Sequence, residues 1–344
     1  MTPPFISIGV TTYNRRELLQ QTLTSILAQS FTDFEVIVGN DYTDEVLTGE
    51  LLGIADSRIR FVNHPQNLKE VGNMNALLAM ASGRYFTWLA DDDLYEPDFL
   101  QSAHKLLVKY DYPAGFFSSY RYFKGLDAPQ YSTGAAGSEQ LLSGREFLAN
   151  YFAGKLKIIS VYGVFDTKIL KQDIGGIEEL CSSPVGLYGE YYFLVRCAML
   201  ENIIYCDAAS ILYRSHATSW SGNNIEIVTY LEAGHQLIRR SAKIFRIPHL
   251  SGSLNSNLLA LCKLHLATFA GRSVAPEIAQ GDCGYAAALR SMAIFLKEAK
   301  KTRQVYISEG GSAGYSSVSA FVMMCVKGCY TIFGMLVMNW LRKL

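Results

Sequence analysis

Three consecutive aspartates, Asp91, Asp92 and Asp93, end an aromatic and β-branched run in the stretch YFTWLADDDLYEPD, residues 85–98. Adjacent carboxylates repel one another and raise one another's pKa, which favours a proton or a cation between them. Closely set carboxylates suit a hard divalent ion such as Mg²⁺ or Mn²⁺, which fills the rest of its shell with water and substrate phosphate oxygens. The three aspartates therefore predict a metal site that holds a phosphorylated substrate.

The segments that must position these aspartates alternate between buried-strand and amphipathic-helix patterns. We expect strands at 5–12, 34–39, 59–63 and 84–90, and helices within 14–30, near 71–81 and at 97–110. Asn14 with Glu17 fits a capping box at the start of the first helix, and Gly83 is expected to close the second. The alternation predicts an α/β fold with a mostly parallel, doubly wound sheet.

Polar clusters follow three of the expected strands: TTYNR (11–15), NDYTD (40–44) and ADDDLY (90–95). Ligands of such sheets bind beyond the carboxyl ends of the strands, where these clusters should meet. Taken singly, each cluster is more typical of a solvated turn or of acidic residues that begin a helix. Their occurrence at successive strand ends favours a binding site.

The order of these motifs, VTTYNRRELLQQTL, then FEVIVGNDYTDE, then RYFTWLADDDLYEPDFL, resembles the inverting glycosyltransferases of family 2, which have the GT-A fold. The resemblance runs from about residue 5 to residue 110 and, more loosely, to about residue 220. It implies a nucleotide-sugar donor as substrate, Mg²⁺ or Mn²⁺ held by a D-x-D motif, and a single displacement that inverts the anomeric centre.

The resemblance also assigns roles to the acidic run. Asp91 and Asp93 match the D-x-D motif, and Asp93 is the first choice for direct metal contact. Asp92 is the alternative, since relatives differ in which carboxylate of such a run touches the ion. Asp91 and Asp92 are also expected to face the donor. His216, in YRSH, corresponds to a histidine that completes the metal or phosphate site in some relatives, and it fits a surface-loop histidine equally well.

The loops after the first two strands match the part of the family that binds the nucleoside. Asp41 matches the residue that hydrogen-bonds the nucleobase, and the loop that packs on the nucleoside contains Thr11, Tyr13 and Arg15. Thr11 stands where the family usually has proline. NDYTDE lacks the usual glycine-serine pair, which leaves the choice among UDP, GDP and dTDP donors open.

Displacement at an anomeric carbon needs a general base near the attacking hydroxyl. In GLYGEYYFLVRC, Glu190 and Arg196 have the six-residue spacing of a later family motif, which more often carries aspartate. The alternative is an exposed glutamate that begins a helix. Arg214 could meet the diphosphate as a bidentate donor, and Trp220 could stack on a sugar or pack in the core.

Beyond about residue 222 we expect helices near 223–246, 253–271 and 283–304 and find no catalytic motif. The last segment is very apolar, and Lys327 is its only charge between Val318 and Leu341. Its aliphatic and Phe residues contribute roughly −4 kcal/mol to insertion, which Lys327 and the glycines about cancel. A helix in the membrane interface is therefore expected rather than a span, the alternative being a helix docked on the protein or in a dimer. The basic run at 297–303 fits a solvated face or an anionic-lipid contact.

The overall composition is consistent with an enzyme of the cytoplasm. The 344 residues carry 31 basic and 31 acidic side chains, which argues against a nucleic-acid binder that neutralises phosphates. Seven cysteines without a C-x-x-C pair indicate a reducing compartment. The N-terminus lacks signal-peptide character, so we expect a cytoplasmic protein, peripheral at the inner face of the cell membrane.

The resemblance implies a GT-A nucleotide-sugar-binding and catalytic domain at 1–221, and the pattern beyond it predicts a helical region at 222–344, with association with a membrane as one of its interpretations. The expected reaction is metal-dependent, inverting transfer of a sugar to an acceptor hydroxyl on a glycan or a lipid-linked oligosaccharide, as in surface polysaccharide synthesis; an oligomer is possible. The alternatives are a sugar nucleotidyltransferase, which should show a glycine-rich loop that VTTYNRREL lacks, and a non-catalytic carbohydrate- or nucleotide-binding module.

Overall fold

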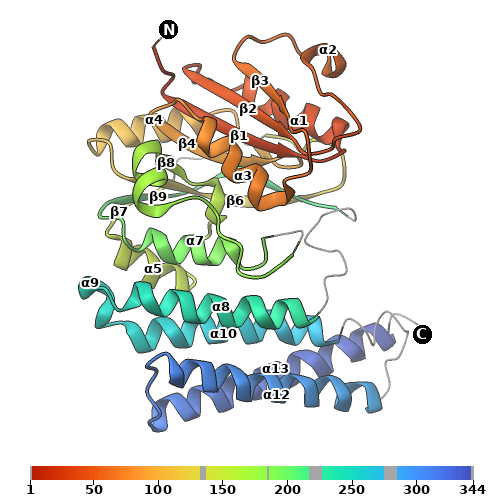
Figure 1. Ribbon diagram of the computed structural model, residues 1–344, viewed down its shortest axis with the longest axis vertical. Helices are drawn as coiled ribbons and strands as arrows, with labels where there is room; N and C mark the ends of the chain where they lie inside the picture. The colour runs from red at the N-terminus through yellow and green to blue at the C-terminus, as the bar shows by residue number, and fades with distance from the viewer. Residues whose placement is uncertain (1, 132–136, 184–185, 217–226, 275–284, 342–344) are drawn as a thin grey trace. The chain divides into compact units, whose positions relative to one another are not determined.

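The computed structural model in Figure 1 describes residues 2–131, 137–183, 186–216, 227–274 and 285–341. The chain divides into two compact units. The first, the N-terminal unit, comprises Met1–Glu179 and Pro184–Asn223, and the second, the helical unit, comprises Leu180–Ser183 and Asn224–Leu344.

The N-terminal unit is built on one mixed sheet with the strand order β3-β2-β1-β4-β8-β6-β9-β5, and β7 pairs with β9. The strands are β1 (Ile6–Thr12), β2 (Phe34–Asn40), β3 (Ile59–Asn63), β4 (Tyr85–Ala90), β5 (Leu94–Tyr95), β6 (Gly115–Lys124), β7 (Glu139–Leu142), β8 (Val164–Asp166) and β9 (Ile203–Ser215). The first four strands are parallel neighbours, whereas β8 runs antiparallel to both β4 and β6. The predicted α/β fold with a largely parallel sheet is confirmed.

Helices flank this sheet. They are α1 (Arg16–Leu27), α2 (Gly49–Leu52), α3 (Lys69–Met80), α4 (Phe99–Lys109), α5 (Gly144–Phe152), α6 (Thr167–Ile169) and α7 (Gly189–Cys197). A 3₁₀ turn, η1 (Ser160–Tyr162), and a π-helical turn, η2 (Leu170–Ile174), complete the unit. Helix α3 packs on β1 and β2 (Figure 1).

Close packing of α3 on β2 depends on a glycine. A Cβ at Gly39 would lie 2.1 Å from Asn73 Oδ1, so only glycine lets this side chain approach. Asn73 Nδ2 donates to the Gly39 carbonyl at 2.9 Å, and its Oδ1 contacts His64 Nε2 at 3.0 Å. This buried network fixes α3 beside the carboxyl end of β2, where the polar loop begins.

The strands form a continuous apolar core, as expected for parallel strands covered on both faces. Ile6, Ile8 and Val10 of β1 are fully buried. Trp88 of β4 is also buried and donates its indole N–H to the Met74 carbonyl of α3 at 2.9 Å. A rigid sheet of this kind is a scaffold that positions the polar loops at its strand ends.

Two local expectations are wrong. Asn14 has φ 52°, a left-handed conformation that an N-cap residue does not adopt, and no side-chain hydrogen bond caps α1. Helix α3 ends at Met80, so Gly83 does not close it. Gly83 instead allows a close approach to β1, because a Cβ there would lie 2.6 Å from the Ser7 backbone nitrogen.

The helical unit consists of α8 (Ile227–Phe245), α9 (Pro248–Ser251), α10 (Leu254–Ser273), α12 (Tyr285–Ser308) and α13 (Tyr315–Leu341). Helix α10 packs against α8, α12 and α13. The predicted helical C-terminal region is confirmed, although the expected starts near 223 and 283 lie outside the described residues. Within the described chain, α13 is the one helix long and apolar enough to cross a membrane.

Candidate functional site

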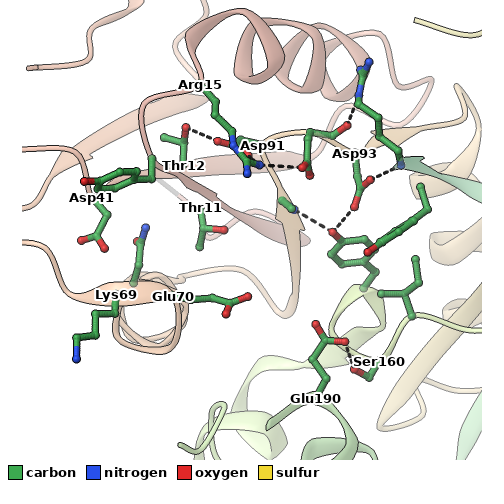
Figure 2. Close-up of a pocket in the computed structure, with 18 of the residues that line it drawn as sticks. Thr11, Thr12, Arg15, Asp41, Lys69, Glu70, Asp91, Asp93, Ser160 and Glu190 are labelled. Carbon is green, nitrogen blue, oxygen red and sulfur yellow. Dashed lines mark hydrogen bonds and ion pairs between the residues drawn. The ribbon is translucent and has the colours of Figure 1, made fainter. Parts of the chain in front are cut away.

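A cavity of about 410 Å³ opens at the carboxyl ends of β1, β2 and β4. Residues of α3, β6, α5, η1, α7 and β9 also line it, and all of its lining residues belong to the N-terminal unit. Figure 2 shows the acidic strand ends on one side of this cavity and the start of α7 on the other. Its size is within the range of small-molecule binding sites.

Asp91, the first of the three aspartates, is buried at the end of β4. Its carboxylate accepts a hydrogen bond from Thr12 Oγ1 at 2.7 Å and lies 3.3 Å from Arg15 Nη1. Burial and the neighbouring Asp92 raise the pKa of Asp91 to about 7, and Arg15 opposes that rise. In the described chain Arg15 thus supplies part of the positive charge that the acidic run requires.

Asp92 shares its carboxylate between two basic groups. Its Oδ2 lies 2.8 Å from Arg15 Nη1 and 3.0 Å from His216 Nε2. The structure therefore brings the end of β9 to the end of β4, as expected if His216 belongs to the same site. Carboxylates with one imidazole form a donor set that a hard divalent ion accepts, so the residues fit Mg²⁺ or Mn²⁺.

Asp93 is 2% exposed, and both of its carboxylate oxygens accept hydrogen bonds from the protein. One bonds the Tyr162 hydroxyl, and the other accepts from the Arg214 backbone N–H at 2.7 Å. Burial, followed by the neighbouring Asp92, raises its pKa well above the usual range. Asp93 as a direct metal ligand stays a prediction, but these bonds tie β4 to η1 and β9 and leave Asp92 as the better-placed carboxylate.

Arg214 lines the cavity and also bonds the protein with its guanidinium, so its contact with a diphosphate stays a prediction. Its Nε donates to the Asp92 carbonyl at 2.6 Å, Nη2 to Gln21 Oε1 at 2.7 Å and Nη1 to the Gly125 carbonyl at 3.1 Å. The guanidinium also lies over the Phe123 ring, 4.5 Å from its centroid. With these contacts Arg214 fixes the backbone of the acidic run.

The two loops expected to bind a nucleoside, which follow β1 and β2, line the same cavity. Thr11, Tyr13 and Asp41 all line it. The Tyr13 ring packs edge-on against Tyr42, with centroids 5.4 Å apart. Asp41 is buried and its Oδ1 accepts the Leu68 N–H at 2.7 Å, which ties the loop after β2 to the start of α3.

Glu190 stands at the first turn of α7, across the cavity from Asp91 and Arg15 (Figure 2). Desolvation by the residues around it, followed by the charge of Glu70, raises the pKa of Glu190 to about 7. The hydrogen bond from Ser160 Oγ at 3.3 Å opposes this rise. The side chain still reaches the water of the cavity, because its residue is exposed. A carboxylate with a pKa near neutrality can both accept and release a proton there.

Arg196, six residues further along α7, does not share this site. It is buried and donates to the Ile174 carbonyl at 2.8 Å and to Glu178 Oε1 at 2.9 Å. The six-residue spacing therefore separates two tasks, because Glu190 faces the cavity while Arg196 holds the 174–178 loop against the helix.

Several cavity residues carry no recognisable signal in the sequence. Tyr162 and Ser160 come from η1, a single 3₁₀ turn, and they contact Asp93 and Glu190 only through tertiary packing. Lys69, which begins α3, also lines the cavity. Trp220 lies outside the described residues.

Comparison with known proteins finds similar glycosyltransferases. A family model described as glycosyl transferase family 2 matches residues 7–165. An uncharacterized glycosyltransferase of Haemophilus influenzae is 28% identical over 145 residues, covering 40% of this chain and 45% of that protein. A GalNAc(5)-diNAcBac-PP-undecaprenol beta-1,3-glucosyltransferase of Campylobacter jejuni is 27% identical over 201 residues, covering 57% of this chain and 63% of that protein. The chain thus matches between about half and two thirds of these two relatives.

Solved structures share the fold. S. aureus TarS, residues 1–349, superposes with a TM-score of 0.59 at 15% identity, covering 96% of this chain and 90% of that one. The same protein in complex with UDP superposes with a TM-score of 0.60 at 14% identity, covering 98% and 92%. The matched segment, residues 7–165, carries the first four strands and the acidic run, and this segment is a match to glycosyl transferase family 2, whose fold is GT-A.

Proposed function

We propose that this protein is a nucleotide-sugar glycosyltransferase whose residues 1–221 bind the donor and catalyse inverting transfer to an acceptor hydroxyl. The observation that carries the proposal is the placement of Glu190 across one cavity from the Asp91–Asp92 cluster. A displacement at an anomeric carbon needs a base on one side of the sugar and a charge-stabilising site at the leaving group on the other. The cavity offers both.

The donor is a uridine diphosphate sugar in this proposal. TarS, which shares the fold, has been solved in complexes with UDP and with UDP-GlcNAc. Thr11, Tyr13 and Asp41 form the nucleoside end of the cavity, and the diphosphate lies beside Asp92 and Arg15. A nucleobase would stack on the Tyr13 ring, a contact worth about 1–3 kcal/mol in nucleic-acid complexes.

Mg²⁺ or Mn²⁺, held by Asp92 and His216 with Asp91 adjacent, would offset the negative charge that develops on the leaving diphosphate. Asp93 and Arg214 position Asp92: the Asp93 carboxylate accepts the Arg214 backbone N–H, and Arg214 Nε donates to the Asp92 carbonyl. Glu190 takes the proton from the acceptor hydroxyl while the hydroxyl oxygen attacks the anomeric carbon and the diphosphate leaves. The pKa of about 7 keeps much of Glu190 ionised at neutral pH.

The acceptor is a lipid-linked glycan at the inner face of the cell membrane. Two relatives are named as glucosyltransferases that act on undecaprenyl-diphosphate-linked sugars, the Campylobacter jejuni protein and Escherichia coli WfgD. Helix α13 supports a membrane contact, because Val322, Val326 and Tyr330 are 55%, 57% and 80% exposed and lie four residues apart on one stripe. We propose that this stripe lies in the membrane interface.

Donor hydrolysis and transfer with and without Mn²⁺ test the proposed enzyme. We expect UDP-glucose or UDP-GlcNAc to be consumed, with an inverted product formed on an undecaprenyl-diphosphate sugar, and UDP with Mn²⁺ to raise the melting temperature more than GDP or dTDP does. Release of diphosphate from a nucleoside triphosphate would identify a nucleotidyltransferase instead. Binding without turnover of any donor would identify a non-catalytic module.

A further inference from the structure

The helical unit contains a second cluster of ionisable side chains that the proposed reaction does not use. His235 comes from α8, His265 from α10 and Glu298 from α12. Their candidate ligand atoms all lie within 4.8 Å of one another. None of the three lines the cavity of the N-terminal unit.

The geometry of this cluster is that of ligands around a common point. Glu298 Oε1 lies 2.7 Å from His235 Nε2 and 3.1 Å from His265 Nε2. Metal–ligand bonds of about 2.0–2.1 Å in a tetrahedral zinc site place neighbouring ligand atoms about 3.3 Å apart. To admit an ion, His235 Nε2 and His265 Nε2 would move away from Glu298 Oε1 by about 0.6 and 0.2 Å respectively.

The surrounding packing holds the ligands in place. His265 and Glu298 are 0% and 2% exposed, and Thr302 Oγ1 donates to Glu298 Oε1 at 3.1 Å. A Cβ at Gly234 would lie 2.0 Å from His265 Nδ1, so a glycine in α8 makes room for the imidazole ring. The His235 side chain is 16% exposed and gives the cluster a route to solvent. Side chains fixed in this way lose little entropy when they bind an ion.

The donor types select the class of metal. Two imidazoles and one carboxylate form a set that zinc accepts, with a fourth position left for a hydroxyl or a water molecule. Mg²⁺ and Ca²⁺ prefer a shell of oxygen atoms.

We propose that His235, His265 and Glu298 bind one Zn²⁺ ion, which joins α8, α10 and α12. The ion holds these three helices together, and this role is independent of the sugar-transfer site. Because a folded helical unit binds the ion and an unfolded one does not, zinc stabilises this part of the chain.

The test uses the full chain with Asp92→Asn, so that the acidic site adds no divalent ion of its own. After stripping with EDTA, reloading with Zn²⁺ and desalting, we expect about one Zn²⁺ per chain by elemental analysis and a higher melting temperature. Glu298→Gln and His235→Gln should lose the retained zinc. The exposed His249 of the same unit provides the matched control, so His249→Gln should keep it.

A second measurement covers the case in which those variants fail to fold. Co²⁺ bound to the Asp92→Asn protein should show the visible absorption of a tetrahedral site with nitrogen ligands, and Zn²⁺ should displace it. Zinc that is absent, zinc retained equally by Glu298→Gln, or a Co²⁺ spectrum equal to that of the hydrated ion would overturn the proposal. The cluster would then be a buried hydrogen-bond network.

Discussion

The two units of this protein place the same kinds of side chain in opposite surroundings. In the N-terminal unit, Asp92 lines an open cavity and contacts His216 behind it, whose side chain is 3% exposed. In the helical unit, Glu298 and His265 meet between packed helices, while most of the exposed residues of α13 are apolar. A carboxylate can meet a substrate only where it faces a space that the substrate can enter, as Asp92 does. In the helical unit these two ionisable side chains are buried, and the exposed surface of α13 is mostly apolar.

The sharpest way to break this comparison is to remove the base from the open cavity. Glu190→Gln keeps the shape of the side chain and loses its basicity, so kcat should fall about 10²-fold or more while donor affinity changes little. Steady-state transfer kinetics with isothermal titration of UDP separate the two effects. Glu201→Gln, an exposed glutamate just beyond the same helix, is the control. A loss of less than about threefold would move the role of base elsewhere, with His216 next.

The acidic run offers a second test, which separates its members. Asp92→Asn should lower transfer about 10²-fold and remove the Mn²⁺-dependent part of UDP binding, because Asp92 carries the proposed metal contact. Asp93→Asn should act mainly on stability, since the Asp93 carboxylate bonds Tyr162 and the Arg214 backbone. The control is Asp111→Asn, at an exposed position with φ 55° that asparagine tolerates. The reverse ranking of Asp92 and Asp93 in metal-dependent binding would restore Asp93 as the ligand.

The dependence of the rate on pH sharpens the comparison further. Glu190 must be ionised to accept a proton, and its pKa is raised to about 7. We therefore expect kcat/KM to rise about tenfold per pH unit below that value and to level off above it. The rising limb should vanish in the residual activity of Glu190→Gln. A profile unchanged in that variant would assign the limb to another group.

The smallest expected effect concerns the apolar stripe of the helical unit. Val326→Lys should weaken binding to uncharged phosphatidylcholine vesicles several-fold by co-sedimentation, since a charge in the interface opposes burial of the stripe. Leu289→Lys is the control, because Leu289 is 49% exposed and lies on α12 rather than α13. Equal binding by both variants would argue against α13 as the contact. Extraction of the wild-type protein by carbonate would further distinguish an interfacial helix from a span.

Short, local patterns make most of the parallel half of the fold predictable. The strand expected at 59–63 has the observed bounds, and those expected at 34–39 and 84–90 differ from the structure by one residue each. The capping box at Asn14 fails because φ 52° turns the chain before the helix begins. The sequence pattern does not reveal β7 and β8, because segments of four and three residues are too short to show a strand periodicity. Their pairing depends on strands that are distant in the sequence.

The same limit applies to the sites. Asp91 and Asp92 are adjacent in the sequence, so their combined charge is evident from the order of residues alone. Tyr162, which bonds Asp93, and His265, which meets Glu298 across 33 residues, become neighbours only through packing. No spacing rule could have paired these residues, because their separation along the chain depends on loop and helix lengths rather than on the chemistry of the site.

The bridge that Arg15 makes between Asp91 and Asp92 has a consequence for the order in which ligands arrive. A cation that takes Asp92 competes with the guanidinium already there, so the metal alone should bind weakly. A nucleoside diphosphate gives that guanidinium a new anionic partner as it leaves the aspartates. Metal and donor should therefore bind synergistically, each raising the affinity for the other by the same factor. Arg15 should thus act as an internal counterion, which neutralises Asp91 and Asp92 until the metal and the donor have both bound.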